Sequence, residues 1–410
     1  MELDYIKVRD YEENKMDVSE LGDFYVLSFS NKEHIKVSGQ AKKIIEKFDG
    51  TKTIDEIIIE LKKDNINFNR QDIERFINDF LISNSMTENS VIKGNNTSKL
   101  WFHYPLIKGE RLSKIFLPFS FLYKDFIVLL VIVATFTLQM YFLKSGFYST
   151  KETFSLYNLN SIGILAIVFM SFLIHELGHV IAALKYKTVV GDMGIGLYLF
   201  RPVFYTDLSN TWKLDRKKRI VTDLGGIYFQ FISVFLLSLC LIFYNTTTIK
   251  VSILLILVSI IGNINPVLRF DGYWIITDLL GIVNVDKRAF EFIKSLFTNL
   301  IKNKKLSANV NINFKKGLKP FFYTYVFIYL VFTIGAVILG LYLVAKLAVN
   351  PEIFTTIFGS IYESVKNRNV GMFISRLNNS LIVLLPLLYI VLLLRTFVKS
   401  LLKIRIKLKK

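Results

Sequence analysis

The chain has 410 residues, of which 52% are hydrophobic, 14% aromatic and only 20% charged, and its mean hydropathy is +0.42. This composition excludes a disordered chain and argues against an ordinary soluble enzyme. The apolar residues are gathered into long runs, which is typical of an integral membrane protein.

The formal net charge of +18 is spread unevenly along the chain. Residues 1–100 carry 15 Lys and Arg against 19 Asp and Glu, a net charge of −4. Residues 101–410 carry 36 against 14, a net charge of +22. Because this basic excess lies between the apolar runs, it indicates membrane orientation rather than nucleic-acid binding. We therefore expect no nucleic acid among the partners.

Residues 1–90 predict a small soluble α+β domain. Apolar and polar residues alternate over 24–29 and 34–37, which predicts two strands. Helices are expected over residues 39–48, 54–63 and 70–83. Thr53 and Glu56 have the spacing of a capping box at the start of the second helix.

Six apolar runs predict membrane-spanning helices, because each meets or approaches the roughly 20 residues that a helix needs to cross a bilayer. They cover residues 126–143, 160–184, 222–244, 251–268, 321–346 and 380–397. A further run over 273–283 is too short to cross fully. The expected fold is mainly α: a polytopic helical membrane protein of about six transmembrane helices, with a small N-terminal α+β domain.

The loops between these runs alternate in basic charge. The connections 185–221 and 284–319 and the tail after residue 397 hold eight, nine and six Lys and Arg. The connections 144–159, 245–250 and 347–379 hold two, one and three. Under the positive-inside rule, this pattern predicts a multi-pass protein of the cell membrane with both termini in the cytoplasm.

The polar linker and the basic segments complete the predicted organisation. We expect four parts: a cytosolic domain over 1–90, a linker and interfacial segment over 91–123, a membrane core over 124–285, and a basic loop, two further transmembrane helices and a basic tail over 286–410. The lipid bilayer is accordingly an expected partner, both for the spans and for the basic tail.

The strongest chemical signal is the pattern His175-Glu176-Leu177-Gly178-His179, near the cytosolic end of the second apolar run. Residues i and i+4 share a helix face, so both imidazoles can reach one metal ion. The glutamate between them can polarise a metal-activated water without being a ligand. The alternative is a chance pair of histidines, but ionisable groups in a membrane span need a reason to be there.

A catalytic zinc ion takes three protein ligands and leaves one position open. The candidates for the third ligand are Asp223, Asp271 and Asp278, each in or beside a later apolar run. Asp271 is favoured because Pro266 stops or kinks the fourth run and Gly272 lets the chain turn. A broken helix inside a membrane is tolerated only where it lines a cavity or a site.

With these two segments the chain resembles the site-2 protease family of membrane-embedded zinc metalloproteases. The family signatures are HExxH on one span and NxxPxPxLDG on a later span. The second signature fits residues 263–272 in register, with Asn263, Pro266, Asp271 and Gly272 at the matching positions. Two positions depart from it, since leucine replaces the second proline and phenylalanine replaces the signature leucine. The resemblance covers roughly residues 120–285.

The resemblance implies a site and a cofactor. His175, His179 and Asp271 would hold one Zn²⁺ per chain, and Glu176 would be the general base. Asn263 would hold or polarise the carbonyl of the substrate.

The apolar, glycine-rich segment 191–207 is too short to cross a membrane. It either forms strands whose edge is offered to an extended substrate or is a packed loop. Gly225 and Gly226 at the start of the third run favour close helix packing. The segment 223–230 that contains these glycines, together with the Tyr-Thr-Asp stretch at 205–207 and the Arg-Phe-Asp-Gly-Tyr stretch at 269–273, resembles the peptide zinc metalloproteases found beside bacterial peptide-export systems.

Residues 37–57 resemble the small winged-helix recognition domains of the pyrroloquinoline-quinone D-protein type. Those domains grip the leader peptides of ribosomally made, modified peptides. The resemblance implies that the N-terminal domain is winged-helix-like and selects a peptide substrate. The alternative is a domain that only packs against the rest of the protein.

The sequence therefore predicts a zinc metalloendopeptidase that cleaves a small precursor peptide or a membrane-associated substrate, in peptide maturation or export. A peptide exporter or a modifying enzyme would be its partner. One alternative is regulated intramembrane proteolysis of a membrane-bound regulator. Another is a non-catalytic transporter or immunity protein that binds zinc without turnover, although a purely structural site has no need of Glu176.

Overall fold

A computed structural model gives the fold of the chain. It describes residues 5–16, 23–29, 34–88, 102–148, 160–198, 201–282, 284–301, 317–349, 352–367, 372 and 376. These residues are mainly helical and include two three-stranded antiparallel sheets. By its contacts the chain divides into two compact units, Met1–Lys319 and Pro320–Lys410, and each is described by itself.

The first unit begins with a sheet in the order β1-β2-β3. Its strands are β1 (Tyr11–Met16), β2 (Phe24–Phe29) and β3 (His34–Ser38). The two strands expected from the alternating pattern are confirmed, whereas β1 was not foreseen because its residues are mostly polar. Residues 30–33, between β2 and β3, lie outside the described residues.

Helices follow this sheet and share one apolar core with it. They are α1 (Gly39–Ile45), α2 (Ile54–Lys63), α3 (Arg70–Phe76) and η1 (Ile77–Ile82), a π-helical continuation of α3. Leu27, Leu61 and Ile73 are fully buried in the core, which draws all its members from residues 6–86. The capping box is confirmed: Thr53 accepts from the backbone of Glu56, whose carboxylate accepts from the backbone of Thr53. This backbone hydrogen bond lowers the pKa of Glu56.

Within the described residues, five helices are long and apolar enough to cross a membrane, which makes the chain a membrane protein by length and composition. They are α5 (Asp125–Lys144), α7 (Ser161–Lys185), α8 (Arg216–Asp223) running into α9 (Gly225–Phe243), α10 (Thr247–Ile264) and α13 (Lys319–Val349). The sixth expected run, 380–397, lies outside the described residues. In the second unit, α13 is followed by α14 (Glu352–Lys366).

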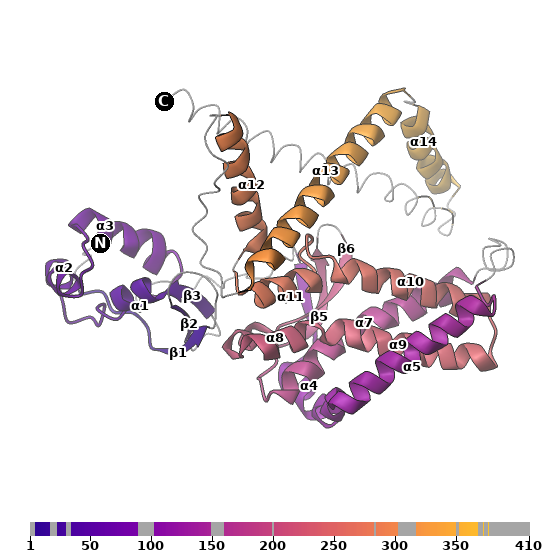
Figure 1. Ribbon diagram of the computed structural model, residues 1–410, viewed down its shortest axis with the longest axis horizontal. Coiled ribbons are helices and arrows are strands. Elements are labelled where there is room, and N and C mark those ends of the chain that lie inside the picture. Colours follow the sequence, from indigo (N-terminus) through magenta and orange to yellow (C-terminus); the bar gives the residue numbers. More distant parts are fainter. Residues whose placement is uncertain are drawn as a thin grey trace. The chain divides into compact units, whose positions relative to one another are not determined.

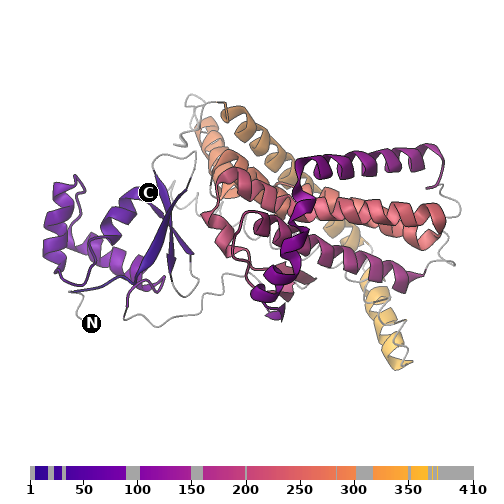
Figure 2. The ribbon, with the colours of Figure 1, turned by 90° about the horizontal axis from the view of Figure 1, so that it is seen from below.

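Helix α9 is the centre of the bundle in the first unit. It packs against α5, α7 and α10, and α7 also packs against α10 (Figures 1 and 2). The side of α9 that faces these neighbours carries small and polar residues, including Gly226, Gln230 and Ser238, all buried. Small residues allow close approach between helices in lipid, where apolar surface by itself gives no preference for a protein neighbour.

A second sheet, in the order β4-β5-β6, is built from segments about 90 residues apart. Its strands are β4 (Phe102–Ile107), β5 (Met193–Tyr198) and β6 (Arg201–Thr206), and β6 is an edge strand that contacts α7. Strands therefore form in the glycine-rich segment 191–207. In the segment expected to be linker and interfacial, the described residues form β4, α4 (Gly109–Phe116) and the 3₁₀ helix η2 (Leu117–Tyr123).

Helix α8 is tied to α11 (Asp271–Leu280) by a buried ion pair. The guanidinium of Arg219 makes hydrogen bonds of 2.7–3.0 Å to both carboxylate oxygens of Asp278, and each residue is at most 6% exposed. Arg216 on the same helix donates to the backbone oxygen of Asp278, near the end of α11. Positive side chains are favourable at the C-terminus of a helix.

Replacing Arg219 by methionine should leave the Asp278 carboxylate buried without a counter-charge. We expect a loss of about 3–5 kcal/mol of stability, seen as a lower thermal midpoint of the protein in detergent. Lys218→Met is the matched control, because Lys218 pairs with an exposed carboxylate and should shift the midpoint little. The double variant Arg219→Met/Asp278→Leu should recover most of the loss. If Arg219→Met and Lys218→Met had equal thermal midpoints, the stabilising role of the Arg219–Asp278 ion pair would be contradicted.

Candidate metal centre

Helix α7 carries the two histidines of the His-x-x-x-His pattern. His175 and His179 are 8% and 7% exposed, and their rings lie edge to face with centroids 4.8 Å apart. The two Nε2 atoms are 3.2 Å apart. The helical spacing thus places both imidazoles on one face, as the sequence predicts.

Asp271 reaches these histidines from the start of α11. It follows a non-helical segment after α10, in which Asn265 Oδ1 accepts from the backbone of Val267 at 2.9 Å. Gly272 permits this geometry, because a Cβ atom there would collide with the carbonyl group of Ile264. The break in the helix and the glycine together bring the carboxylate to the histidine pair.

The three side chains are close enough to share one ion. Asp271 Oδ2 lies 3.2 Å from His175 Nε2, and Asp271 Oδ1 lies 3.5 Å from His179 Nε2. All three ligand atoms fall within 4.8 Å of one another. Donors about 2.0–2.1 Å from a tetrahedral zinc ion lie about 3.3 Å apart, so the observed separations suit such an ion.

The hydrogen bond behind His179 fixes which of its nitrogens faces the site. His179 Nδ1 lies 2.8 Å from the backbone oxygen of Thr222, and a carbonyl can only accept. Nδ1 therefore carries a hydrogen, and in the neutral imidazole this leaves the lone pair of Nε2 on the side of Asp271 Oδ1. This arrangement is typical of metal-binding histidines. Two imidazole nitrogens and a carboxylate that converge at 3.2–3.5 Å form a donor set typical of a metal site, so these residues fit a metal ion.

The second carboxylate oxygen of Asp271, Oδ2, also indicates a metal site. Among the described residues, buried Asp271 Oδ2 forms no hydrogen bond, although it lies 3.2 Å from His175 Nε2, and buried His175 Nδ1 has no partner either. An unsatisfied buried carboxylate oxygen is costly, and a cation in the ligand group would remove that cost.

Close packing of α7 on α9 creates the space between the imidazoles. A Cβ atom on Gly178 would collide with the backbone oxygen of Gly225. A Cβ atom on Gly226 would lie 2.5 Å from the Nε2 atoms of both His175 and His179. The close approach expected from the paired glycines is present, and Gly226 in addition leaves the ligand atoms uncovered.

Glu176 is held by the sheet. Its Oε2 accepts a hydrogen bond of 2.9 Å from the hydroxyl of Thr206, the last residue of β6. The sequence singles out the stretch around Thr206 but assigns it no role, because strand and helix are brought together only by the fold.

Asn263 lies at the C-terminal end of α10 and outside the ligand group. Its Nδ2 donates to Oε1 of Gln230 at 3.3 Å, and Gln230 Nε2 in turn is 3.3 Å from Ser259 Oγ. Gln230 is fully buried, one helical turn after Gly226 on α9. Asn263 therefore presents its remaining amide hydrogen and its oxygen away from Gln230.

The two other candidate ligands lie elsewhere. Asp278 is engaged by Arg219, and Asp223 is not among the ligand-type side chains that converge in the described residues. Two supports of the site could not be recognised in the sequence: the backbone carbonyl of Thr222, which contacts His179, and the side chain of Gln230, which contacts Asn263. A backbone carbonyl has no residue signature, and the partner of a buried glutamine depends on helix packing.

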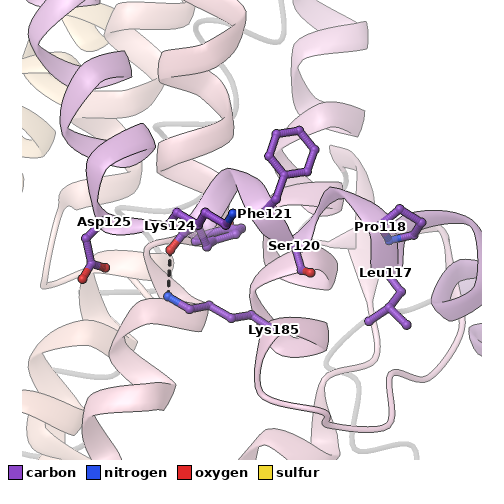
Figure 3. A pocket seen from close by; sticks show the side chains of 8 residues that line it. Leu117, Pro118, Ser120, Phe121, Lys124, Asp125 and Lys185 are labelled. Atoms are coloured by element: carbon purple, nitrogen blue, oxygen red, sulfur yellow. Dashed lines mark hydrogen bonds between the residues drawn. The ribbon is translucent and has the colours of Figure 1, made fainter.

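A separate hollow of about 580 Å³ lies between η2, the start of α5 and the end of α7 (Figure 3). It is lined by Leu117, Pro118, Ser120, Phe121, Tyr123, Lys124, Asp125 and Lys185. Lys185 Nζ donates to the backbone oxygen of Tyr123 at 2.8 Å, shown as a dashed line in Figure 3. None of its lining residues belongs to the metal-ligand group, so it is distinct from the candidate centre.

Comparison with known proteins gives one informative match. The chain is 28% identical over 116 residues to the Bacillus subtilis (strain 168) protein named "Putative peptide zinc metalloprotease protein YydH". The match covers 28% of this chain and 46% of the relative, so the chain spans less than half of that protein's length. No protein-family model matches the chain, and no solved structure matches it significantly. A zinc metalloprotease is thus the kind of protein to which part of this chain is similar.

Gly226→Ala should abolish or greatly reduce metal binding, because the added methyl group would occupy the space between the two histidines. We expect near-stoichiometric zinc in the wild type and little in the variant, measured by mass spectrometry of the purified protein. Gly262→Ala on α10 is the control, since a Cβ atom there meets nothing within 4 Å. Full zinc occupancy in Gly226→Ala would show that the ligand group is not where the ion binds.

Proposed function

We propose that this protein is a membrane-embedded zinc metalloendopeptidase of the site-2 protease type. The observation that carries the proposal is the convergence of His175, His179 and Asp271, with Glu176 between the histidines on a helix apolar enough to span a membrane. The partial similarity to a peptide zinc metalloprotease supports the same chemistry.

The chemistry that a bound zinc ion would supply is Lewis acidity, which polarises a carbonyl group and lowers the pKa of water to about 7. Glu176 Oε2 is hydrogen-bonded to Thr206, so Oε1 is the oxygen that would take a proton from the attacking water and pass it to the departing amine. Asn263 would donate its remaining amide hydrogen to the substrate carbonyl, with Gln230 fixing the orientation of its amide group.

The substrate would bind as an extended chain. A peptide bond in a helix has its carbonyl already hydrogen-bonded, so a helical substrate must unwind before it is cleaved. Strand β6 has an edge that no described strand covers, and it ends at Thr206, which contacts Glu176. A peptide added along this edge would run toward the base. A small precursor peptide cleaved during maturation or export meets this requirement.

The N-terminal domain, residues 1–90, would select the substrate in the cytoplasm. Its sheet and helices have an apolar core of their own, which supports a separate folding unit. We assign it winged-helix-like recognition of a leader peptide, and we assign a peptide exporter or modifying enzyme as the partner. Both termini would lie in the cytoplasm of a cell-membrane protein, as the basic loops indicate.

Metal analysis of ligand variants tests the centre directly. Wild-type protein in detergent or nanodiscs should hold one zinc ion per chain, and His175→Ala and Asp271→Ala should each lose most of it, because two remaining ligands bind weakly. Mass spectrometry of the three proteins in parallel measures this. Zinc retained in Asp271→Ala would redirect the third-ligand assignment to Asp223. No metal in the wild type after zinc is added back would overturn the metalloprotease proposal and favour a transporter or binding protein.

Glu176→Gln should keep its zinc but lose peptidase activity by roughly 10²–10⁴-fold, because the amide cannot accept the proton. The assay incubates the protein with a defined pool of synthetic peptides and identifies the cleavage products by mass spectrometry. Glu110→Gln, an exposed position on α4, is the control for loss of one carboxylate. Cleavage by Glu176→Gln at the wild-type rate would refute the assigned base.

A further inference from the structure

The ligand Asp271 is flanked by two residues that converge on one carboxylate. Arg269 and Tyr273 stand two positions before and two positions after it. Arg269 Nη2 lies 2.9 Å from Asp286 Oδ2, and the hydroxyl of Tyr273 donates to Asp286 Oδ1 at 2.9 Å. Asp286 thus binds both sides of the segment that carries Asp271, and it uses a different oxygen for each.

Asp286 belongs to α12 (Val285–Ile301), which is not one of the candidate membrane spans. It stands in the first turn of this helix, where a carboxylate is favourable. Its neighbours Val285 and Ala289 are fully buried, so packing holds this end of the helix in place. The hydrogen bonds from Arg269 and Tyr273 lower the pKa of Asp286, although its partial burial acts in the opposite direction.

The three groups form a compact cluster. The Tyr273 side chain is 1% exposed, and the side chains of Arg269 and Asp286 are 28% and 23% exposed. The guanidinium of Arg269 lies over the ring of Tyr273, 5.4 Å from its centroid. Hydrogen bonds to charged groups in such partly buried surroundings are stronger than exposed ones, so the cluster is rigid enough to fix the backbone between its members.

Asp271 has little else to orient it. Metal-ligating carboxylates are usually held by hydrogen bonds from surrounding groups. Among the described residues, however, the groups recorded close to the carboxylate of Asp271 are the two imidazoles, and Oδ2 receives no hydrogen bond. Its direction must therefore come from its backbone, which is fixed by Gly272 against α10 on one side and by the Asp286 cluster on the other.

From this arrangement we infer that Asp286 is a positioning residue of the metal centre. It acts through Arg269 and Tyr273 to hold Asp271 at the distance and angle at which its carboxylate meets the histidines. Helix α12, which follows the membrane core in the chain, is thereby part of the support of the site. The inference rests on the proposed function, because it requires that His175, His179 and Asp271 bind a metal ion.

The test compares the metal affinity of wild type, Asp286→Asn and Glu291→Gln in detergent. Glu291 is an exposed residue on the same helix, paired at 3.6 Å with Arg288, and its substitution removes the same charge. We expect Asp286→Asn to bind zinc about 10–100-fold more weakly in competition with a chelator, as is typical when a support of a metal ligand is removed. Glu291→Gln should match the wild type.

Replacing zinc by Co²⁺ gives a second measurement, which should not change if Asp286 only stabilises the fold. The visible absorption of Co²⁺ depends on the geometry of its ligands, so Asp286→Asn should change this spectrum while its thermal midpoint stays near that of Glu291→Gln. Asp286→Glu should restore part of the affinity. If Asp286→Asn does not fold, Tyr273→Phe removes one hydroxyl from the cluster and should still weaken zinc binding severalfold.

The possible results separate the inference from the proposed function. If the wild type binds zinc, and Asp286→Asn and Tyr273→Phe both bind zinc and cobalt as the wild type does, the positioning role alone is overturned. A wild type that binds neither ion would overturn the proposed function and the positioning role together. Weakened binding in Asp286→Asn with an unchanged Glu291→Gln is the expected result.

Discussion

The backbone contact between α7 and α9 is the constraint on which the candidate centre depends. Gly178 and Gly225 approach so closely that neither position has room for a side chain, and the next glycine, Gly226, lies against both imidazoles. Small residues give this kind of contact its stability in lipid, because they allow extensive backbone packing. Without it, the histidines would pack against a neighbouring side chain and no space for an ion would remain.

The remaining parts of the site are connected to this contact through α8 and α11. The carbonyl of Thr222 at the end of α8 orients His179, and three residues earlier Arg219 binds Asp278 of α11. Helix α11 begins with Asp271, so α8 links one histidine to the helix that supplies the third candidate ligand. The orientation of His179 and the position of Asp271 thus both depend on α8.

The sequence predicts the local features of this structure well. The five apolar runs within the described residues correspond to helices, the capping box at Thr53 forms, and the spacing of His175 and His179 places them on one face. The segment after α10 could be recognised because a proline and a glycine interrupt an apolar run. Each of these features is set by residues within one continuous stretch of the chain.

Features that join distant segments could not be predicted in this way. Strand β4 pairs with β5 across about 90 residues, and its residues are mostly exposed and show no apolar–polar alternation that would predict a strand. The contact of Thr206 with Glu176 and that of Asp286 with Arg269 depend on how a strand or a helix is placed against another helix. The winged-helix likeness, the sixth span and the orientation in the membrane stay predictions.

The candidate ligands come from segments 96 positions apart, since Asp271 follows His175 by that distance. An ion held by them would act as a cross-link that closes a long loop of chain, and its binding energy would contribute to the assembly of the bundle. Insertion into the membrane would therefore have to bring α7 and α11 together before metal loading could be complete. The metal-free protein would be the looser of the two forms and the one more exposed to cellular proteases.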